Sequence, residues 1–165
     1  MSKLNVDQKN IKLLLADKRA DFLIPDYQRP YAWSEEECQT LWEDIFAFAI
    51  PEGDATRFNS EEEYYLGPIV TFKNEDNKLE VIDGQQRLTT LMLLLRAFHI
   101  SFGNMRDDNS KKIKEAIESC IWKTDEFGNA NKDLLKIDSE VATDNDKGEF
   151  LEILNTGIAP STMRS

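Results

Sequence analysis

A glycine-centred junction between a strand and an apolar helix is the feature that most limits how this 165-residue chain can fold. Residues 79–83 read "LEVID", a β-branched run typical of a strand. Gly84 breaks the run, and the apolar residues from Leu88 to about Phe102 predict a helix. The junction therefore carries "DGQQR" and a hydroxyl pair between a strand and the most apolar helix of the chain.

This junction predicts an anion site. A strand that turns sharply into a helix directs several backbone N–H groups toward one place and adds the positive end of the helix dipole. Arg87 supplies a planar cation, and Thr89 and Thr90 supply hydroxyl donors. Phosphate is the usual ligand of such a site, and Asp83 is positioned to orient a metal ion or a water molecule. The alternative is an ordinary Asp-Gly turn whose glutamines and arginine are surface caps.

A second segment, "YQRPYAW" at residues 27–33, combines aromatic side chains with a cation. Arg29 lies between Tyr27 and Tyr31, and Trp33 follows. Aromatic faces near a guanidinium suit base stacking or cation–π contact, and the guanidinium needs an anionic partner. The alternative is a loop whose aromatic rings pack against the core beside the next helix.

The remaining periodicities predict an α+β fold, with a small sheet packed against several helices. Helices are expected at residues 5–17, capped by Asn5 or Asp7, and at 35–50, 110–122 and 146–155. The helix at 35–50 opens with a capping box, Ser34 to Glu37, and ends at Pro51. Strands are expected at 21–24, 64–72, 79–83 and 132–138, with a hairpin joining the second and third.

Composition limits the partners of the chain. The net charge of −11 and pI near 4.6 repel a polyanion, so DNA contact is expected only through regions outside this chain. The longest apolar run, "LMLLL", is too short to cross a bilayer, and the N-terminus lacks the apolar region of a signal peptide. Cys38 and Cys120 fall in helical patterns and are expected to be buried free thiols. We therefore expect a cytoplasmic protein without a membrane partner.

Several chemistries are excluded by the residue types present. The sequence has no G-x-x-x-x-G-K-[ST] motif, which excludes a P-loop nucleoside triphosphatase. Its single histidine, His99, lies in the apolar helix and is expected to be a packed core or boundary residue. One histidine and two distant cysteines do not make a zinc site, a hydrolase triad or a histidine-based nuclease centre.

Together the two motifs resemble a known family. "P-x-Y-Q-R-x-Y-x-W", an amphipathic helix, "YYLGPIV" and "VIDGQQRLTTL" are similar to the N-terminal domain of GmrSD-type modification-dependent restriction endonucleases. The resemblance is specific over residues 20–100 and looser over 1–19 and 101–155. It implies a ParB/sulfiredoxin-like fold with a small mixed sheet, so that residues 1–155 form a nucleotide-binding domain. Residues 156–165 carry no pattern and are expected to be an unstructured tail or the cut end of a longer chain.

The resemblance also implies a function, the binding and hydrolysis of a nucleoside triphosphate with Mg²⁺ that regulates DNA cleavage in phage defence. The DNA-cutting part of the family is usually a separate HNH-type domain or subunit, and that partner is absent from these residues. The implied catalytic residues are Asp83, Gln85, Gln86 and Arg87, with Asp83 also as metal ligand. The implied nucleotide-binding residues are Tyr27, Gln28, Arg29, Tyr31, Trp33, Gly84, Arg87, Thr89 and Thr90.

Within this interpretation Arg87 holds the phosphates and Arg29 is a second clamp, so both side chains are expected to line one pocket. One of the two glutamines positions the nucleophile, and the sequence does not say which. Two other interpretations use the same cleft. One is a non-enzymatic module that senses modified DNA or a partner protein, and the other is a kinase-like phosphotransferase.

Overall fold

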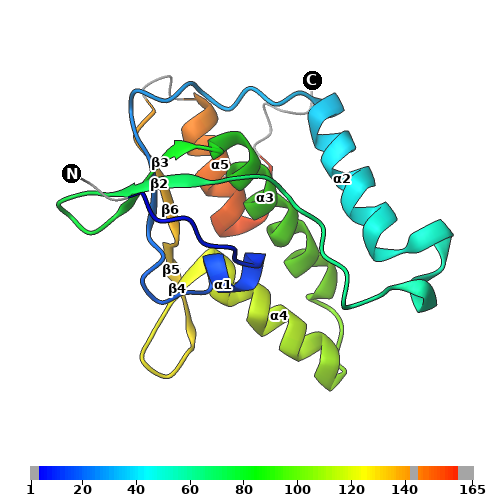
Figure 1. The fold of residues 1–165 in the computed structure, drawn as a ribbon. Helices are drawn as coiled ribbons and strands as arrows, with labels where there is room; N and C mark the ends of the chain where they lie inside the picture. The colour runs from blue at the N-terminus through cyan, green and yellow to red at the C-terminus, as the bar shows by residue number, and fades with distance from the viewer. Residues whose placement is uncertain (1–3, 142–144, 160–165) are drawn as a thin grey trace.

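The computed structural model describes residues 4–141 and 145–159 and confirms the α+β prediction (Figure 1). Its helices are α1 (Ile11–Leu15), α2 (Glu35–Ala49), α3 (Gln85–Phe102), α4 (Asp108–Ile121) and α5 (Asn145–Thr156), with two short 3₁₀ helices, η1 (Pro51–Gly53) and η2 (Ala55–Arg57). Its strands are β1 (Phe22–Ile24), β2 (Val70–Lys73), β3 (Leu79–Asp83), β4 (Trp122–Thr124), β5 (Ala130–Leu135) and β6 (Ile137–Ser139). Among the described residues, no helix is long and apolar enough to cross a membrane.

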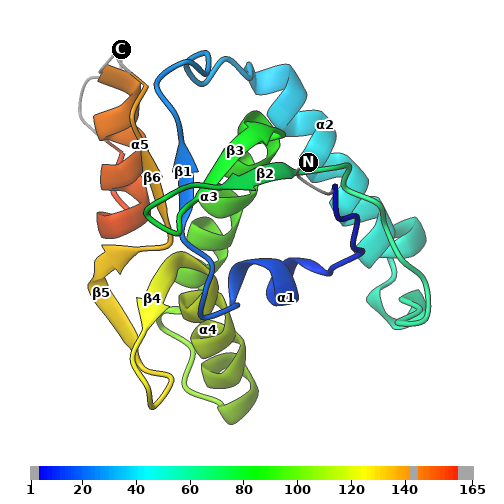
Figure 2. The same ribbon diagram turned by 60° about the vertical axis from the view of Figure 1, so that its left-hand side comes forward.

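Four strands form a small mixed sheet in the order β2-β3-β1-β6. The central strand β1 is parallel to both β3 and β6, and β2 is antiparallel to β3 as the predicted hairpin requires. Strands β4 and β5 form a separate antiparallel ribbon beside α4 (Figure 2). The parallel pairing of β1 with β3 brings the loop after Ile24 to the same sheet edge as the β3–α3 junction. The two sequence motifs therefore meet in space.

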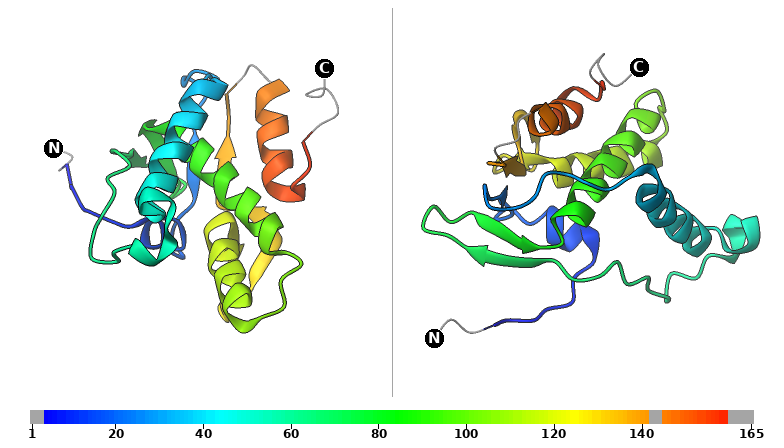
Figure 3. Two further views of the ribbon diagram at one scale, coloured as in Figure 1. Left: turned by 90° about the vertical axis from the view of Figure 1, so that its right-hand side faces the viewer. Right: turned by 90° about the horizontal axis from the view of Figure 1, so that it is seen from above.

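The core lies between the sheet and the helices. From the sheet, Phe22, Val81 and Ile137 are buried in it. They pack with Leu88 and Met92 of α3 and with Leu15, Cys120, Phe150 and Leu154 from the other helices. Helix α3 is the central element, and it lies between α5 and α2 in every view (Figures 2 and 3). Burial of one α3 face fixes where its N-terminus points.

Helix α3 begins at Gln85, three residues earlier than predicted, so the polar junction forms its first turn. Gly84 precedes it with φ +87°, a left-handed conformation that favours glycine. A Cβ at this position would lie 2.8 Å from the carbonyl oxygen of Pro68. Gly84 therefore permits both the sharp turn and the close approach of residues 68–69.

Two predicted elements are shorter in the structure. Helix α1 begins at Ile11, because the side chain of Asn10 accepts a hydrogen bond from the Leu13 N–H (2.8 Å) and caps it there. Strand β2 begins at Val70 instead of residue 64, because Gly67 has φ +101° and Pro68 has no N–H to donate. The capping box at the start of α2 is confirmed, with the Ser34 N–H donating to the Glu37 carboxylate at 2.8 Å.

The predicted strand at 132–138 is divided between two sheets. Residues before Lys136 pair with β4 in the ribbon, and residues after it pair with β1 in the main sheet. Trp122, predicted to end a helix, instead begins β4 with φ −110° and ψ 152°. Lys136 is the crossing point, since its N–H donates to the Ile121 carbonyl (2.9 Å) and its carbonyl accepts from the Phe22 N–H (2.8 Å).

The side chain of Lys136 is buried, with an exposed fraction of 1%. Its ammonium donates to the carbonyl oxygens of Leu15 and Asp17, each at 2.8 Å, and so ties the end of α1 to the sheet. Burial lowers the pKa of Lys136 from its ordinary value. Of the tail predicted at 156–165, Thr156 ends α5 and the Gly157 N–H closes that helix on the Ile153 carbonyl (2.8 Å). Residues 160–165 lie outside the described residues.

Lys136→Met should destabilise the fold. The substitution leaves two buried carbonyl oxygens without their donor, so we expect the free energy of unfolding to fall by about 2–4 kcal/mol. The measurement is urea denaturation followed by circular dichroism. Lys112→Met, at an exposed position of α4, is the control and should change stability by less than about 0.5 kcal/mol. Equal stabilities for the two variants would contradict the role given to Lys136.

Candidate functional site

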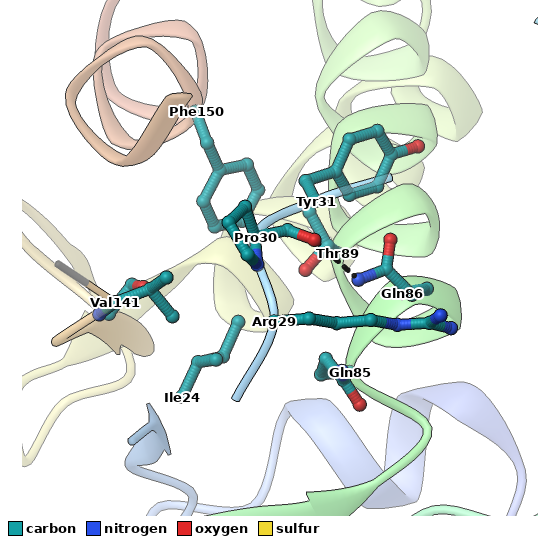
Figure 4. A pocket seen from close by; sticks show the side chains of 10 residues that line it. Ile24, Arg29, Pro30, Tyr31, Gln85, Gln86, Thr89, Val141 and Phe150 are labelled. Carbon is teal, nitrogen blue, oxygen red and sulfur yellow. Dashed lines mark hydrogen bonds between the residues drawn. The ribbon is translucent and has the colours of Figure 1, made fainter. Parts of the chain in front are cut away.

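A narrow cavity lies at the N-terminus of α3, where the two motifs meet (Figure 4). Its volume is about 30 Å³. It is lined by the end of β1, the loop after it, the first turns of α3, the end of β6 and α5, through Ile24, Arg29, Pro30, Tyr31, Gln85, Gln86, Thr89, Ser139, Val141 and Phe150. Part of the lining is apolar, and the rest combines a cation, two amides and three hydroxyls, those of Tyr31, Thr89 and Ser139. A space of this size admits water-sized polar groups but not a nucleobase.

The side chain of Gln86 joins the two motifs directly. Its Oε1 accepts hydrogen bonds from the backbone N–H groups of Ala32 (2.7 Å) and Trp33 (3.3 Å). Its Nε2 donates to the carbonyl oxygen of Pro30 at 3.2 Å, the dashed line in Figure 4. Gln86 thus satisfies the backbone of a loop that contains proline and has no strand partner there. Both the oxygen and the nitrogen of its amide are thus used to position that loop.

Tyr31 makes a second link between the loop and the helices. The Thr90 hydroxyl donates to the Gln86 carbonyl (2.8 Å), so it accepts from the Tyr31 hydroxyl at 2.8 Å. The Cys38 thiol, at 3.2 Å, is then the donor to the Tyr31 oxygen. Burial, with the Cys38 contact, raises the pKa of Tyr31 to about 12, so the phenol keeps its proton at neutral pH. Both cysteines are free, as expected. Cys120 is buried as predicted, whereas Cys38 is only half-buried.

Gln28 continues the hydrogen bonding of the sheet beyond the end of β1. Strand β1 pairs with β3 only as far as Glu80. The Gln28 side chain then donates to the next two carbonyl oxygens of β3, those of Val81 (3.2 Å) and Ile82 (2.9 Å). The loop is therefore attached to β3 as well as to α3. Gln28, Tyr31, Gln86 and Thr90 are all explained by these attachments.

Three of the remaining polar residues that line the cavity, Arg29, Gln85 and Thr89, have no side-chain partner among the described residues. Gln85 has an exposed fraction of 9% and Thr89 one of 4%, yet in the described part of the chain neither side chain has a hydrogen bond. The exposed Arg29 guanidinium likewise forms no ion pair or hydrogen bond with any described residue, and it extends toward the first turn of α3 (Figure 4). These polar groups are open to the cavity and have no protein partner, so water or an added ligand can bind them there.

The first turn of α3 adds backbone donors to this group. The N-terminal N–H groups of a helix have no acceptor within it, and Gly84 has no side chain to cap them. The first turn also contains no acidic residue. Asp83 turns one carboxylate oxygen back to the Gly84 N–H (2.9 Å), and its side chain is exposed. The positive end of the dipole is therefore not neutralised by the helix itself.

Arg87 is directed elsewhere. Its Nη1 donates to the carbonyl oxygen of Pro68 at 3.0 Å, and its guanidinium lies against Gly67, where an added Cβ would come within 2.9 Å of both terminal nitrogens. Arg87 is not among the residues that line the cavity. The structure thus brings Arg29 to the cavity but does not bring Arg87 there, and the predicted convergence of the two side chains on one pocket is not found. Without Gly67 next to it, the arginine could not pack this closely on the backbone.

The other aromatic candidates also lie outside the cavity lining. Tyr27 is exposed, and Trp33 is half-buried and attached through its backbone to Gln86. Three lining residues from the C-terminal third, Ser139, Val141 and Phe150, were not identified from the sequence. These three residues belong to no recognisable sequence motif. They come close to α3 only through the pairing of β6 with β1 and the packing of α5.

His99 belongs to a separate buried network at the other end of α3. Arg96 donates to its Nδ1 (2.7 Å), so its proton lies on Nε2, which donates to the Glu118 carboxylate (2.8 Å). Burial lowers the pKa of His99, which keeps the imidazole neutral at neutral pH. His99 is a packed boundary residue, and the described residues contain no cluster of three or more potential metal ligands.

Comparison with known proteins adds one finding. A family model described as "GmrSD restriction endonuclease, N-terminal domain" matches residues 11–161, almost the whole chain. The match includes both motifs and every residue that lines the cavity. None of the curated proteins compared with the chain matches it.

Adjacent glutamines of α3 should respond differently to the same substitution. Gln86→Ala removes three hydrogen bonds to the loop, and we expect the free energy of unfolding to fall by about 2–3 kcal/mol. Gln85→Ala removes none and should change it by about 1 kcal/mol or less. The two side chains are buried to a similar extent, so each variant controls for the other. Equal losses in denaturant unfolding would contradict the assignment of Gln86 as the residue that holds the loop.

Proposed function

The chain belongs to the family of GmrSD restriction endonuclease N-terminal domains, and we propose that it binds a nucleoside triphosphate at the N-terminus of α3 and hydrolyses it. In this proposal the domain regulates the endonuclease part of a restriction enzyme in the cytoplasm. The observation that carries the proposal is the group of unpartnered polar side chains, Arg29, Gln85 and Thr89, beside an uncapped helix start. A phosphate group supplies the acceptors and the negative charge that these donors lack.

The dimensions of the cavity support binding by the phosphates rather than by the base. A volume of about 30 Å³ suits phosphoryl oxygens, so the nucleobase would lie outside, within reach of the exposed Tyr27 or the half-buried Trp33. Tyr31 is better suited to positioning the loop, because its hydroxyl is already engaged on two sides. The same narrowness disfavours a module that would read a modified base inside this cleft.

The residues present fit a magnesium ion that accompanies the triphosphate. Mg²⁺ is usually held by one or two carboxylates together with substrate phosphates and water. Asp83 offers an exposed carboxylate next to the helix start, and only one of its oxygens is engaged. The metal ion would neutralise charge on the β- and γ-phosphates. Asp83 alone would be its protein ligand.

The proposed reaction is hydrolysis of the γ-phosphate. A water oxygen attacks the γ-phosphorus, the bond from phosphorus to the β–γ bridging oxygen breaks, and the products are nucleoside diphosphate, inorganic phosphate and a proton. Gln85 would orient the attacking water with its free amide, since the amide of Gln86 is occupied by the loop. Arg29 and the N–H groups of α3 would stabilise the charge that develops on the phosphoryl oxygens.

Arg87 has a secondary role in the proposed site. One of its terminal nitrogens is engaged with Pro68, and the guanidinium lies outside the cavity lining. Its charge still belongs to the first turn of α3 and would attract a triphosphate at longer range. By holding residues 67–68, it also positions the segment that contacts Gly84.

Arg29→Ala should weaken binding of a triphosphate with Mg²⁺ by about 30- to 1,000-fold. This range follows from the loss of a charge-assisted contact worth about 2–4 kcal/mol, at about 1.4 kcal/mol per tenfold. Arg29→Lys should restore little, because an ammonium lacks the planar fork. The measurement is calorimetric titration with each of the four ribonucleoside triphosphates, beside a phosphate-release assay.

Arg87→Ala is the matched comparison and should weaken binding by only about tenfold or less, since its guanidinium does not line the cavity. A thermal melt of each variant separates loss of binding from loss of folding. Unchanged affinity in folded Arg29→Ala would remove Arg29 from the site. A larger effect at Arg87 than at Arg29 would place the phosphates on the Pro68 side of α3.

A further inference from the structure

The helix α2 has two large aromatic side chains, Trp42 and Phe46, that the rest of the described chain covers only in part. Only Leu41 of this helix is buried. Phe46 has an exposed fraction of 44%, and its one ring contact is with Trp42, whose ring lies 5.7 Å away, centroid to centroid. Trp42 in turn contacts Phe98 of α3 at 6.1 Å. Trp42 thus lies where α2 contacts the body, and Phe46, one turn further along, is partly exposed to solvent. The helix itself lies at the margin of the molecule (Figure 3).

The charge of the chain is concentrated around this helix. Residues 35–63, which we call the acidic arm, comprise α2, η1, η2 and the following loop. They contain ten acidic residues and a single basic one, Arg57, which gives a net charge of −9. The remaining 136 residues contribute only −2 to the total of −11. Most of the net negative charge of the chain therefore lies in the arm.

A second aromatic group fixes the distal part of the arm. Phe48 packs edge-on against Phe58 at 5.9 Å and against Tyr64 at the same distance. The Tyr64 hydroxyl also donates to the Asp44 carboxylate at 3.0 Å. These contacts hold the loop against α2, so the carboxylates and the exposed rings are presented on one preformed surface. A preformed surface loses little conformational entropy when it binds a partner.

The side chains on this surface indicate what kind of partner can bind it. Exposed rings surrounded by carboxylates fit a protein surface that has apolar side chains within a cationic rim, and they repel nucleic acid. An endonuclease must contact DNA phosphates through lysine and arginine side chains, so the endonuclease part of the enzyme necessarily has a cationic face. We propose that the acidic arm docks on the DNA-contacting face of that endonuclease part and competes with DNA for it.

This inference goes beyond the proposed nucleotide site, because it requires no triphosphate. It rests on the membership of the chain in a restriction endonuclease family and on an endonuclease part that contacts DNA. The arm would keep the nuclease from DNA until the two parts separate. Because the attraction is between surface charges, it should weaken as the salt concentration rises.

The test uses the complete restriction enzyme, this chain together with its endonuclease part, without nucleotide. Four exposed arm carboxylates are neutralised in the variant Glu36→Gln/Glu43→Gln/Glu61→Gln/Glu62→Gln. The control variant Glu75→Gln/Asp76→Asn/Glu115→Gln/Glu126→Gln neutralises four exposed carboxylates elsewhere. Binding of a fluorescent DNA duplex is measured by anisotropy at about 50 mM and about 500 mM salt, the range over which surface electrostatics are screened.

At low salt we expect the arm variant to bind DNA about tenfold more tightly than the native enzyme. The control variant should change the DNA affinity by less than about threefold. At high salt the difference in affinity between the arm variant and the native enzyme should vanish. Carbodiimide, which joins carboxylates to lysines in contact, should link the native arm to the endonuclease part, and excess DNA should abolish these links. Equal effects of the two variants, or unchanged affinity in both, would overturn the proposal. Links from the arm only to a second copy of this chain would also overturn it. A failure of nucleotide binding affects none of these results.

Discussion

The hydrogen bonds of the Gln86 side chain are the interaction on which the arrangement of this site depends. They hold residues 30–33 against the first turn of α3 although the two segments are more than 50 residues apart in the chain. The Tyr31–Thr90 hydrogen bond also holds the loop against α3, and the hydrogen bonds of Gln28 hold it against β3. With the loop held in this way, Arg29 extends toward the start of α3 and lines the cavity. Loss of Gln86 would therefore disturb the site without removing any proposed ligand contact.

A division of labour follows between neighbouring residues of one motif. Gln86 and Thr90 form hydrogen bonds to the loop, whereas Gln85 and Thr89 line the cavity without a hydrogen bond to any described residue; Gln86 also forms part of the cavity wall. Residues four apart lie on the same face of a helix, which explains why the two pairs separate so cleanly. The side chains of Gln86 and Thr90 are engaged in hydrogen bonds that hold the loop. Those of Gln85 and Thr89 remain free to bind a ligand. The Tyr31 hydroxyl is likewise engaged in positioning the loop, and Arg29 has no ion pair or hydrogen bond among the described residues.

The sequence predicted the fold class and the meeting of the two motifs better than it predicted the details of the site. Periodicity and capping residues located α2, α3 and α4, because burial of one helix face leaves a clear pattern. The direction of Arg87 could not be predicted, since it depends on the close packing of its guanidinium against Gly67. The division of residues 132–138 at Lys136 also had no local signal, because a lysine is rarely buried as a crossing point between sheets. The contribution of Phe150 required the tertiary packing of α5 on α3.

The central claim is that the N-terminus of α3 receives phosphate, and amide NMR tests it most directly. A triphosphate with Mg²⁺ should shift the backbone N–H resonances of Gln85, Gln86 and Arg87 and the side-chain amide of Gln85. The side-chain amide of Gln28 should stay where it is, because its donor is held by the carbonyl oxygens of β3. Tripolyphosphate should reproduce most of these shifts, since the base lies outside the cavity in our account. Saturable shifts confined to other parts of the molecule, such as the His99 network, or no shifts at millimolar triphosphate, would contradict it.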